Sequence, residues 1–491
     1  MLHMLVLLLS MGGVGAGQQT PTPPPAASTK IDPPGELDKL AESCGAFKVV
    51  GCAEELLTLH PVHVAVGSIA PQNGVGLGVA FGAHKDTETW QTSWNADGVG
   101  SFNGSWRAGV YGRFVITGSR APVAVFGRDK WLPSKANLTE LPEHTVIGLT
   151  AQEISLSQLN YFGLGPQSPL GGQSVYGMRE FIGGVSVVKP FAGTLHASVY
   201  GEINDRSVSI QSRLGQTPPS IEALYNDTTA PGRSTPRSFA QVGEGLRIRP
   251  VFFSDTIRLN YDISLRDYFA VSDARSTFHR LVIDLSHDIA LYRSTTRTLL
   301  PREANGPDDC AISTDDKTRG CSVDTEAMAR ACRAKPNAKP SDCDAISRDL
   351  QGRVTFRMFL SDALTPTGHV VPFYFQPTLG GSDVNGDPTL ASYQDSRFRA
   401  PTLLLLRQSF EHSIAGPIGF ALLLDQGKVA SSTGRLGASP WMHSASAGLT
   451  IRAAGAPQVY ILYSRGGPEG THTSFTINTA LLGGTPRPSV F

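Results

Sequence analysis

One stretch of strict alternation constrains the fold of this chain more than any other feature. In residues 256–269, TIRLNYDISLRDYF, apolar side chains occupy every second position and polar or charged ones fill the positions between. Successive side chains of a β-strand point to opposite faces, so the stretch predicts a strand with one oily and one ionic face. The apolar positions are Ile257, Leu259, Tyr261, Ile263 and Leu265, and the polar ones are Arg258, Asn260, Asp262, Ser264 and Arg266.

The same period of two recurs in residues 195–204 and 278–291, and short β-like runs separated by turn signals begin near residue 60. A membrane-spanning barrel and a soluble β-sandwich both alternate in this way. The polar positions here carry Arg and Asp and little Lys, which suits a wet lumen lined by both signs of charge. Composition alone leaves both folds open.

Composition excludes several classes of protein. The 42 basic and 42 acidic residues balance, which argues against a nucleic-acid partner because such a surface needs a basic excess. No stretch reaches about 18 apolar residues, so no transmembrane helix is predicted. Charged residues make up 17% of the chain and glycines number 52, a composition that fits many short strands.

The N-terminus predicts export. Residues 4–11, MLVLLLSM, form an apolar core, and residues 15–17, GAG, offer small side chains for cleavage, although His3 is the only potential cation before the core. A misassigned start codon or a short buried segment is the alternative. We expect a signal peptide over 1–17, a Pro-rich linker over 18–35 and a short N-terminal segment with a cysteine pair over 36–56.

Six cysteines in an exported chain predict disulfides. Four of them recur every eleven residues in an insert over 302–350, which also has helical patterns over 325–332 and 341–350. A zinc site is the less favoured alternative, because no close CxxC pair is present. We expect Cys44 to pair with Cys52, whereas the sequence does not choose among the three possible pairings of Cys310, Cys321, Cys332 and Cys343.

Two further stretches carry a resemblance to a known family. Residues 371–430 combine an aromatic run, a long polar loop and two close apolar strands joined by a turn at 415–417. Residues 161–166, YFGLGP, are followed by YGMR at 176–179. In this order the stretches resemble the C-terminal barrel of the BamA/TamA (bacterial surface antigen) family of outer-membrane assembly proteins.

The resemblance implies an all-β fold, a transmembrane antiparallel β-barrel of about sixteen strands. The barrel would cover residues 57–482 and precede a C-terminal tail over 483–491. The chain would then lie in the outer membrane of a Gram-negative-type bacterium, without the POTRA domains that precede the barrel in this family. The resemblance also implies that the loop 376–400 folds back into the lumen, and that the 302–350 insert lies at a periplasmic turn.

In that family, an Arg of the lumenal loop pairs with an Asp on a following strand. The matching loop motif here is Leu390-Ala391-Ser392-Tyr393, and the matching acid is Asp425. Because Ala391 replaces the Arg and a buried carboxylate without a partner is costly, we expect Arg397 or Arg399 to pair with Asp425. The other residues expected at this site are Gly380, Gly381, Leu390, Tyr393, Phe398 and Gly427.

Three function classes remain open. The resemblance implies outer-membrane assembly, protein insertion or translocation, with outer-membrane lipid, periplasmic proteins and unfolded outer-membrane proteins as partners. A passive channel plugged or lined by the 376–400 loop is the second. A lipid-hydrolysing barrel is the third, but no Gly-x-Ser-x-Gly motif marks a nucleophile, and alternation places His279 and His287 on the outer face as structural residues. We therefore expect no enzymatic activity and no cofactor.

Overall fold

In the computed structural model, the chain divides into two units, Met1–Cys52 and Ala53–Phe491, and every described residue lies in the second. The expected signal peptide, linker, N-terminal segment and C-terminal tail lie outside the described residues, as do all six cysteines and residues 302–346 of the expected insert. The described residues are 62–87, 89–116, 144–192, 195–215, 217–235, 237–253, 256–297, 347–386, 388–415, 418–453 and 456–477.

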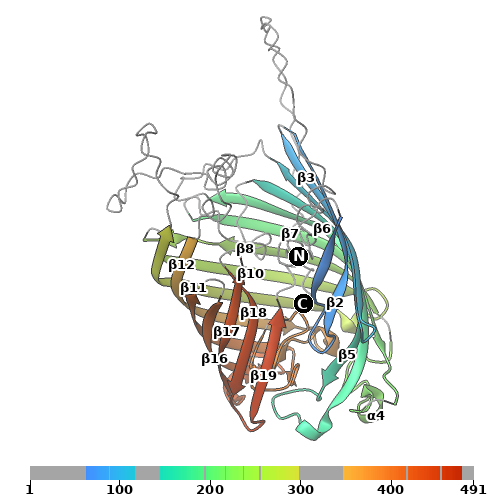
Figure 1. Ribbon diagram of the computed structural model, residues 1–491. Coiled ribbons are helices and arrows are strands. Elements are labelled where there is room, and N and C mark those ends of the chain that lie inside the picture. Colours follow the sequence, from blue (N-terminus) through green and yellow to red (C-terminus); the bar gives the residue numbers. More distant parts are fainter. Residues whose placement is uncertain are drawn as a thin grey trace, which may run out of the picture. The chain divides into compact units, whose positions relative to one another are not determined.

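The described residues form one curved antiparallel sheet, in which each long strand pairs with the next long strand along the chain (Figure 1). The sheet has seventeen strands, of which β9 has only two residues, so sixteen are long. This sequential pairing is that of an up-and-down barrel, and it confirms the all-β barrel of about sixteen strands predicted above. The strands are β1 (Val62–Ser68), β2 (Val75–Asp86), β3 (Trp90–Ser101), β4 (Trp106–Ile116), β5 (Thr145–Tyr161), β6 (Ser174–Ala192), β7 (Ala197–Gln211), β8 (Arg237–Ile248), β9 (Val251–Phe252), β10 (Ile257–Ala270), β11 (Phe278–Arg297), β12 (Ser347–Leu364), β15 (Thr402–Ala415), β16 (Ile418–Ala430), β17 (Met442–Ala453), β18 (Ala456–Arg465) and β19 (Thr471–Ile477).

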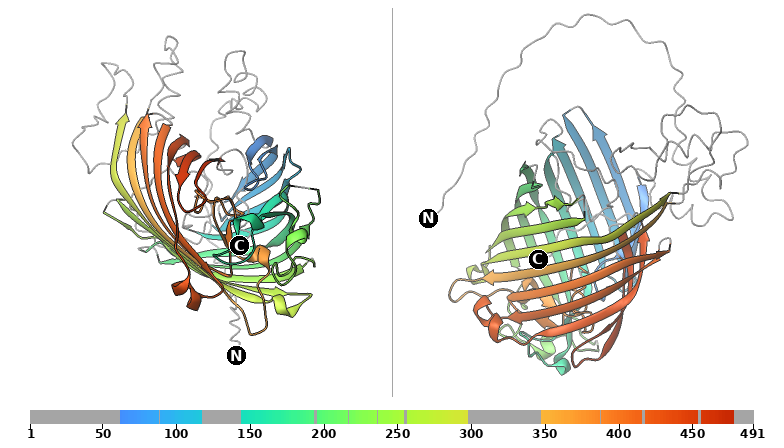
Figure 2. Two further views of the ribbon diagram at one scale, coloured as in Figure 1. Left: turned by 90° about the horizontal axis from the view of Figure 1, so that it is seen from below. Right: turned by 90° about the vertical axis from the view of Figure 1, so that its left-hand side faces the viewer.

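The first and last strands are the edges of this sheet. β1 pairs with β2 along its whole length, and β19 pairs with β18. The strands β1 and β19 approach each other, yet no residue register joins them within the described part of the chain. Figure 2 shows the blue and red ends of the sheet facing one another in its left view. We call this junction the seam.

The two faces of the sheet differ as the alternation predicts. On β10, Ile263 and Phe269 point outward and are 41% and 45% exposed, whereas the inward Ser264 and Tyr268 are buried. No helix among the described residues is long and apolar enough to cross a membrane. The outer face carries many exposed apolar side chains, including Leu77, Val79, Val110, Ile203, Leu291, Leu424, Leu449 and Tyr463.

A long connection between β12 and β15 runs inside the barrel. We call residues 365–401 the inner segment; it contains the short helix η4 (Phe373–Phe375) and the two-residue strands β13 (Thr378–Leu379) and β14 (Phe398–Arg399). Most of its described residues after Val371 are buried, although it begins in an exposed turn. The segment is therefore longer than the loop expected over 376–400, because the preceding aromatic run belongs to it.

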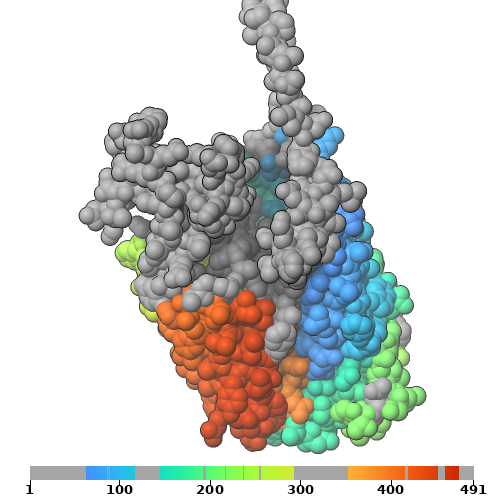
Figure 3. Space-filling model, viewed as in Figure 1, coloured from blue at the N-terminus to red at the C-terminus, as the bar shows by residue number. Residues whose placement is uncertain are grey.

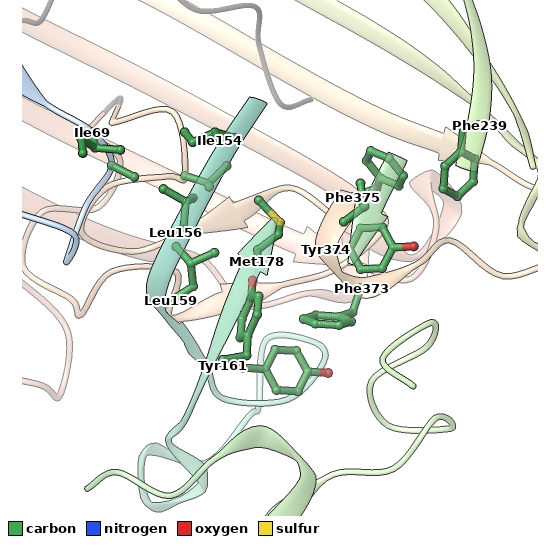
Figure 4. Close-up of a cluster of buried hydrophobic side chains, with 14 of the residues drawn as sticks. Ile69, Ile154, Leu156, Leu159, Tyr161, Met178, Phe239, Phe373, Tyr374 and Phe375 are labelled. Carbon is green, nitrogen blue, oxygen red and sulfur yellow. The ribbon is translucent and has the colours of Figure 1, made fainter. Parts of the chain in front are cut away.

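Aromatic side chains fix one end of the inner segment against the wall. Phe373 packs edge-on against Tyr161 of β5 and Tyr176 of β6, with ring centroids 5.0 Å apart in both pairs. Phe375 contacts Phe239 of β8 in the same way, also at 5.0 Å. Figure 4 shows Tyr161, Phe239, Phe373 and Phe375 in the largest buried apolar cluster of the described residues. Such edge-to-face pairs add about 0.5–1.5 kcal/mol each beyond their burial.

The connections β3–β4, β10–β11 and β18–β19 are short turns. The strands expected from the alternating stretches at 195–204 and 278–291 are confirmed, because these stretches lie almost entirely in β7 and β11. The helix predicted over 341–350 is wrong for residues 347–350, which pair with β11 as the start of β12. The predicted turn at 416–417 lies outside the described residues. The short helices are α4 (Ile221–Leu224), η1 (Leu170–Gly172), η2 (Ala274–Ser276) and η5 (Thr433–Ala438).

Candidate functional site

The acid expected at the centre of the site lies on the inner wall of the barrel and has a different partner from the expected one. Asp425 of β16 is 2% exposed and accepts two hydrogen bonds from Arg407 of β15, at 2.7 Å from Nε and 2.9 Å from Nη2. The prediction that Arg397 or Arg399 pairs with Asp425 is therefore wrong. This planar, two-bond geometry is the strongest form of carboxylate–guanidinium contact.

Strand register explains the observed pair. Arg407 and Asp425 stand directly opposite each other in the β15–β16 hairpin, so their side chains share the inward face. A bulge between Ser413 and Ala415 sets this register. Without that bulge the same turn would place Gln408 opposite Asp425, and Arg407 would not face the acid directly.

The wall pair also binds the inner segment. Nη2 of Arg407 donates to the carbonyl oxygen of Pro388 as well as to Asp425. A wall Arg thus connects the acid to the backbone of the inner segment. Ala391, at the position where the resemblance implies an Arg, is buried.

Arg397 lies elsewhere and has its own acid. Its Nε donates to Glu469 in the turn between β18 and β19, and both side chains are 6% exposed. Nη1 and Nη2 donate to the hydroxyl and carbonyl oxygens of Ser168, at 2.9 and 2.8 Å. The guanidinium also lies 4.8 Å from the ring centroid of Phe162. Arg397 thus joins the inner segment to two different turns.

Arg399 is held by carbonyl oxygens and aromatic rings. Nη1 donates to the carbonyl of Phe373 at 2.7 Å, and Nη2 donates to the hydroxyl of Tyr176 at 3.3 Å. Its own carbonyl accepts from the amide of Gly165 at 2.7 Å, within the YFGLGP stretch. The two sequence stretches that carried the family resemblance therefore meet at this residue.

The two expected glycines sit where the inner segment crosses itself. Gly380 has φ +111° and Gly381 has φ +57°, a region that favours glycine. A Cβ on Gly380 would lie 2.5 Å from the Cβ of Arg397, and a Cβ on Gly381 would overlap a carboxylate oxygen of Asp395. Because neither glycine has a side chain, the backbone at residues 380–381 can lie in direct contact with residues 394–397.

A second apolar cluster packs the inner segment against strands β15, β16 and β17. Gly427 of β16 leaves room for Leu379, whose Cδ1 would be 2.6 Å from a Cβ at position 427. Ser392 donates its backbone amide to the hydroxyl of Ser444 on β17, at 3.0 Å. The buried members of this cluster are Leu379, Leu390, Tyr393, Phe398, Ala400, Leu403, Leu405, Val429 and Met442.

The inner wall carries acidic and basic side chains that form ion pairs with one another. Arg357 and Arg407 stand directly opposite each other on β12 and β15, and each turns away toward its own acid. Arg357 binds Asp284 through two hydrogen bonds of 2.8 and 2.7 Å. The side chains that follow one another across β11, β12, β15 and β16 are therefore Asp284, Arg357, Arg407 and Asp425, two bases between two acids. Further wall pairs are Arg107–Asp97, Arg247–Asp262 and Arg353–Glu411.

The two histidines considered for catalysis lie on the outer face. His279 Nδ1 is 2.6 Å from Asp267, with side chains 40% and 30% exposed, and His287 is 2.9 Å from the hydroxyl of Tyr261. Within the described residues, no group of three or more His, Cys, Asp or Glu side chains is placed to hold a metal ion.

Sequence reasoning missed three participants of the site: Arg407, Glu469 and Ser168. For Arg407 a signal was available, because alternation in β15 places it on the same face as Leu403 and Leu405. Glu469 and Ser168 lie in turns, where no periodicity indicates the direction of a side chain. Their contacts depend on the path of the inner segment across the barrel.

Comparison with known proteins gives structural similarities only. No family model and no curated protein matches the chain. It is similar to CdiB from Acinetobacter baumannii (14% identity, TM-score 0.41, 85% of this chain and 60% of that chain). It is also similar to BamA from Haemophilus ducreyi lacking POTRA domains 1–3 (10%, 0.45, 85% and 69%) and to CdiB from Escherichia coli (11%, 0.46, 84% and 62%). The chain spans 60–69% of the length of these three chains.

Proposed function

We propose that this chain is an outer-membrane β-barrel that assists the assembly, insertion or translocation of other proteins. The observation that supports this most is the inner segment, which enters the barrel between the eleventh and twelfth long strands and is bound there by the Arg407–Asp425 pair. A loop folded into the lumen at this place is what the sequence resemblance to the BamA/TamA family implies.

The surface chemistry supports the membrane location. Outward side chains such as Leu424 and Leu449 are large, apolar and more than half exposed, which suits contact with lipid tails. Backbone groups of the long strands bond to neighbouring strands, as they must inside a bilayer. We therefore expect the protein in the outer-membrane fraction, with lipid around the barrel.

The polar inner wall supports transit of an unfolded protein. Side chains of both charge signs line it, and a hydrated two-signed surface binds an extended polypeptide weakly and without sequence preference. Unfolded outer-membrane or secreted proteins are the clients that this chemistry fits. The inner segment would occupy the lumen when no client is present.

Depletion of the protein tests this function. Outer-membrane proteins are inventoried by mass spectrometry after depletion, with complementation by the wild-type gene as the control. The proposal predicts that a subset of outer-membrane or secreted proteins falls severalfold and recovers on complementation. An unchanged inventory, or recovery of the protein from the soluble periplasm, would overturn it.

A passive channel is the second candidate, because part of the inner wall is polar and carries ion pairs. Planar-bilayer recordings separate the two functions. A channel predicts a steady wild-type conductance, whereas an assembly barrel filled by the inner segment predicts brief and rare openings. A steady conductance combined with an unchanged protein inventory would favour the channel.

A further inference from the structure

We propose that residues 392–397 of the inner segment form a clasp across the seam, holding the β18–β19 turn and the β1–β2 turn to one another. A regulatory role for this clasp rests on the proposed function, because it would control when the edges of the barrel part. Figure 3 shows orange atoms between the red C-terminal strands and the blue N-terminal strands, in the colour range of this part of the chain.

One arm of the clasp binds the β18–β19 turn, residues 466–470. The guanidinium of Arg397 donates to Glu469, and the backbone amide of Gln394 reaches the other carboxylate oxygen of Glu469 at 3.5 Å. The carboxylate is thus engaged twice from the segment. Because Arg397 and Glu469 are both almost fully buried, water screens their attraction little.

The same turn is shaped to fit the segment. A Cβ on Gly467, whose φ is +61°, would overlap the hydroxyl of Tyr393, and a Cβ on Gly466 would lie 2.9 Å from the hydroxyl of Ser392. The turn therefore closes over Ser392 and Tyr393 with no room for side chains of its own. This interlock is independent of the ion pair.

The other arm reaches the β1–β2 turn. Asp395 accepts a hydrogen bond from the side-chain amide of Gln72 at 3.4 Å, and its other oxygen accepts from the backbone amide of Ser382 at 2.8 Å. Gln72 has φ +66°, so the turn presents it in a left-handed conformation. Its neighbour Asn73 is fully buried and bonds to the carbonyl of Gln158 on β5, at 2.7 Å.

The clasp is anchored away from the seam. Ser168 in the β5–β6 loop accepts from Arg397, and Pro388 of the segment accepts from Arg407 on β15. The two edge hairpins are consequently tied to a segment that is itself fixed at β15 and at β5–β6. Loss of either arm frees one edge strand while the rest of the barrel keeps its ladders.

Hydrogen–deuterium exchange of the full-length protein in lipid nanodiscs tests the clasp. Glu469→Gln removes the charge of the first arm, Asp395→Asn removes that of the second, and both keep side-chain shape. Asp284→Asn is the matched control, because Asp284 is a wall acid on β11 that is bound to Arg357 of β12. Heat-modifiable mobility on gels shows that each variant is folded.

The clasp predicts that Glu469→Gln speeds exchange in β19 about tenfold and that Asp395→Asn does the same in β1, since each loses a charge-assisted contact. The control should leave both strands at the wild-type rate. Unchanged exchange of β1 and β19 in both clasp variants would overturn the proposal, as would equal acceleration by the control. The exchange rates are measured without any client protein. An unchanged protein inventory after depletion would therefore overturn the proposed function without affecting the result for the clasp.

Discussion

At the residue scale, Asp425 and Arg407 connect the barrel wall to the inner segment. The acid is buried, its two oxygens are taken by one guanidinium, and the same guanidinium donates to Pro388. Removing one partner from such a pair leaves an uncompensated buried charge, which costs about 3–5 kcal/mol. The pair therefore helps to fix both the position of the inner segment and the register of β15 against β16.

We predict that Arg407→Gln makes the inner segment sensitive to added protease while the barrel still assembles. The variant leaves Asp425 buried without a cation and also loses the bond to Pro388. Cleavage of the segment in intact outer membranes is the measurement, and Arg353→Gln, which changes another wall pair, is the control. Equal cleavage of wild type and Arg407→Gln would contradict the role given to this residue.

Gly427 offers a second residue-scale prediction. Because Leu379 fills the space beside it, Gly427→Ala should overpack the contact and destabilise the barrel by about 1–3 kcal/mol. The double variant Gly427→Ala with Leu379→Ala should recover part of that loss. Thermal unfolding measures both, with Gly434→Ala as the control, since a Cβ there would meet nothing within 4 Å.

At the element scale, the hairpin turns are held by their own polar contacts. Asp273, in the β10–β11 turn, accepts from Arg237 of β8 at 2.9 Å and from the backbone amide of Arg275 at 3.2 Å. The hydrogen bond from Arg237 is the main cause that lowers the pKa of Asp273 to about 2. This carboxylate thus joins the β10–β11 turn to the first residue of β8.

The lowered pKa predicts how this contact responds to acid. A carboxylate with a depressed folded-state pKa stabilises the fold above its ordinary value near 3.9, and that contribution is lost as the pH falls toward about 2. Pepsin cleavage of the turn should therefore rise progressively as the pH falls from 4 through 3 to 2. Asp273→Asn should be cleaved equally at all three pH values; a wild-type profile in this variant would contradict the assignment.

The elements themselves were largely predictable from alternation. Residues 257–266 place Ile263 outward and Ser264 inward as the period of two requires, because a sheet with an oily and a wet side fixes the direction of every side chain. The partner of Asp425 was not predictable in the same way. It depends on the bulge at 413–415, which shifts the register by one residue and leaves no mark in the hydrophobic pattern.

At the scale of the whole molecule, the inner segment is the feature that distinguishes this barrel from a simple pore. It meets β6, β15, β16 and β17 and the turns beside β1 and β19, which lie far apart in the sequence. The loop itself was predictable from its length and polarity and from the family resemblance. Its contacts with Glu469 and Ser168 were not, because they follow from the three-dimensional path of the chain.

We infer that the inner segment lies against the inner face of β16 in the membrane-embedded protein. Oxidative cross-linking of the Leu379→Cys, Gly427→Cys double variant in outer-membrane vesicles tests it, because these side chains would be in contact. The native cysteines stay in place, and linked peptides are identified by mass spectrometry. The matched control is Leu379→Cys with Ser286→Cys, since Ser286 lies on β11 and bonds to Asn260.

The account predicts that most of the protein carries the 379–427 link and that the control pair does not cross-link. Absence of the link, with both introduced thiols open to a soluble alkylating reagent, would contradict it.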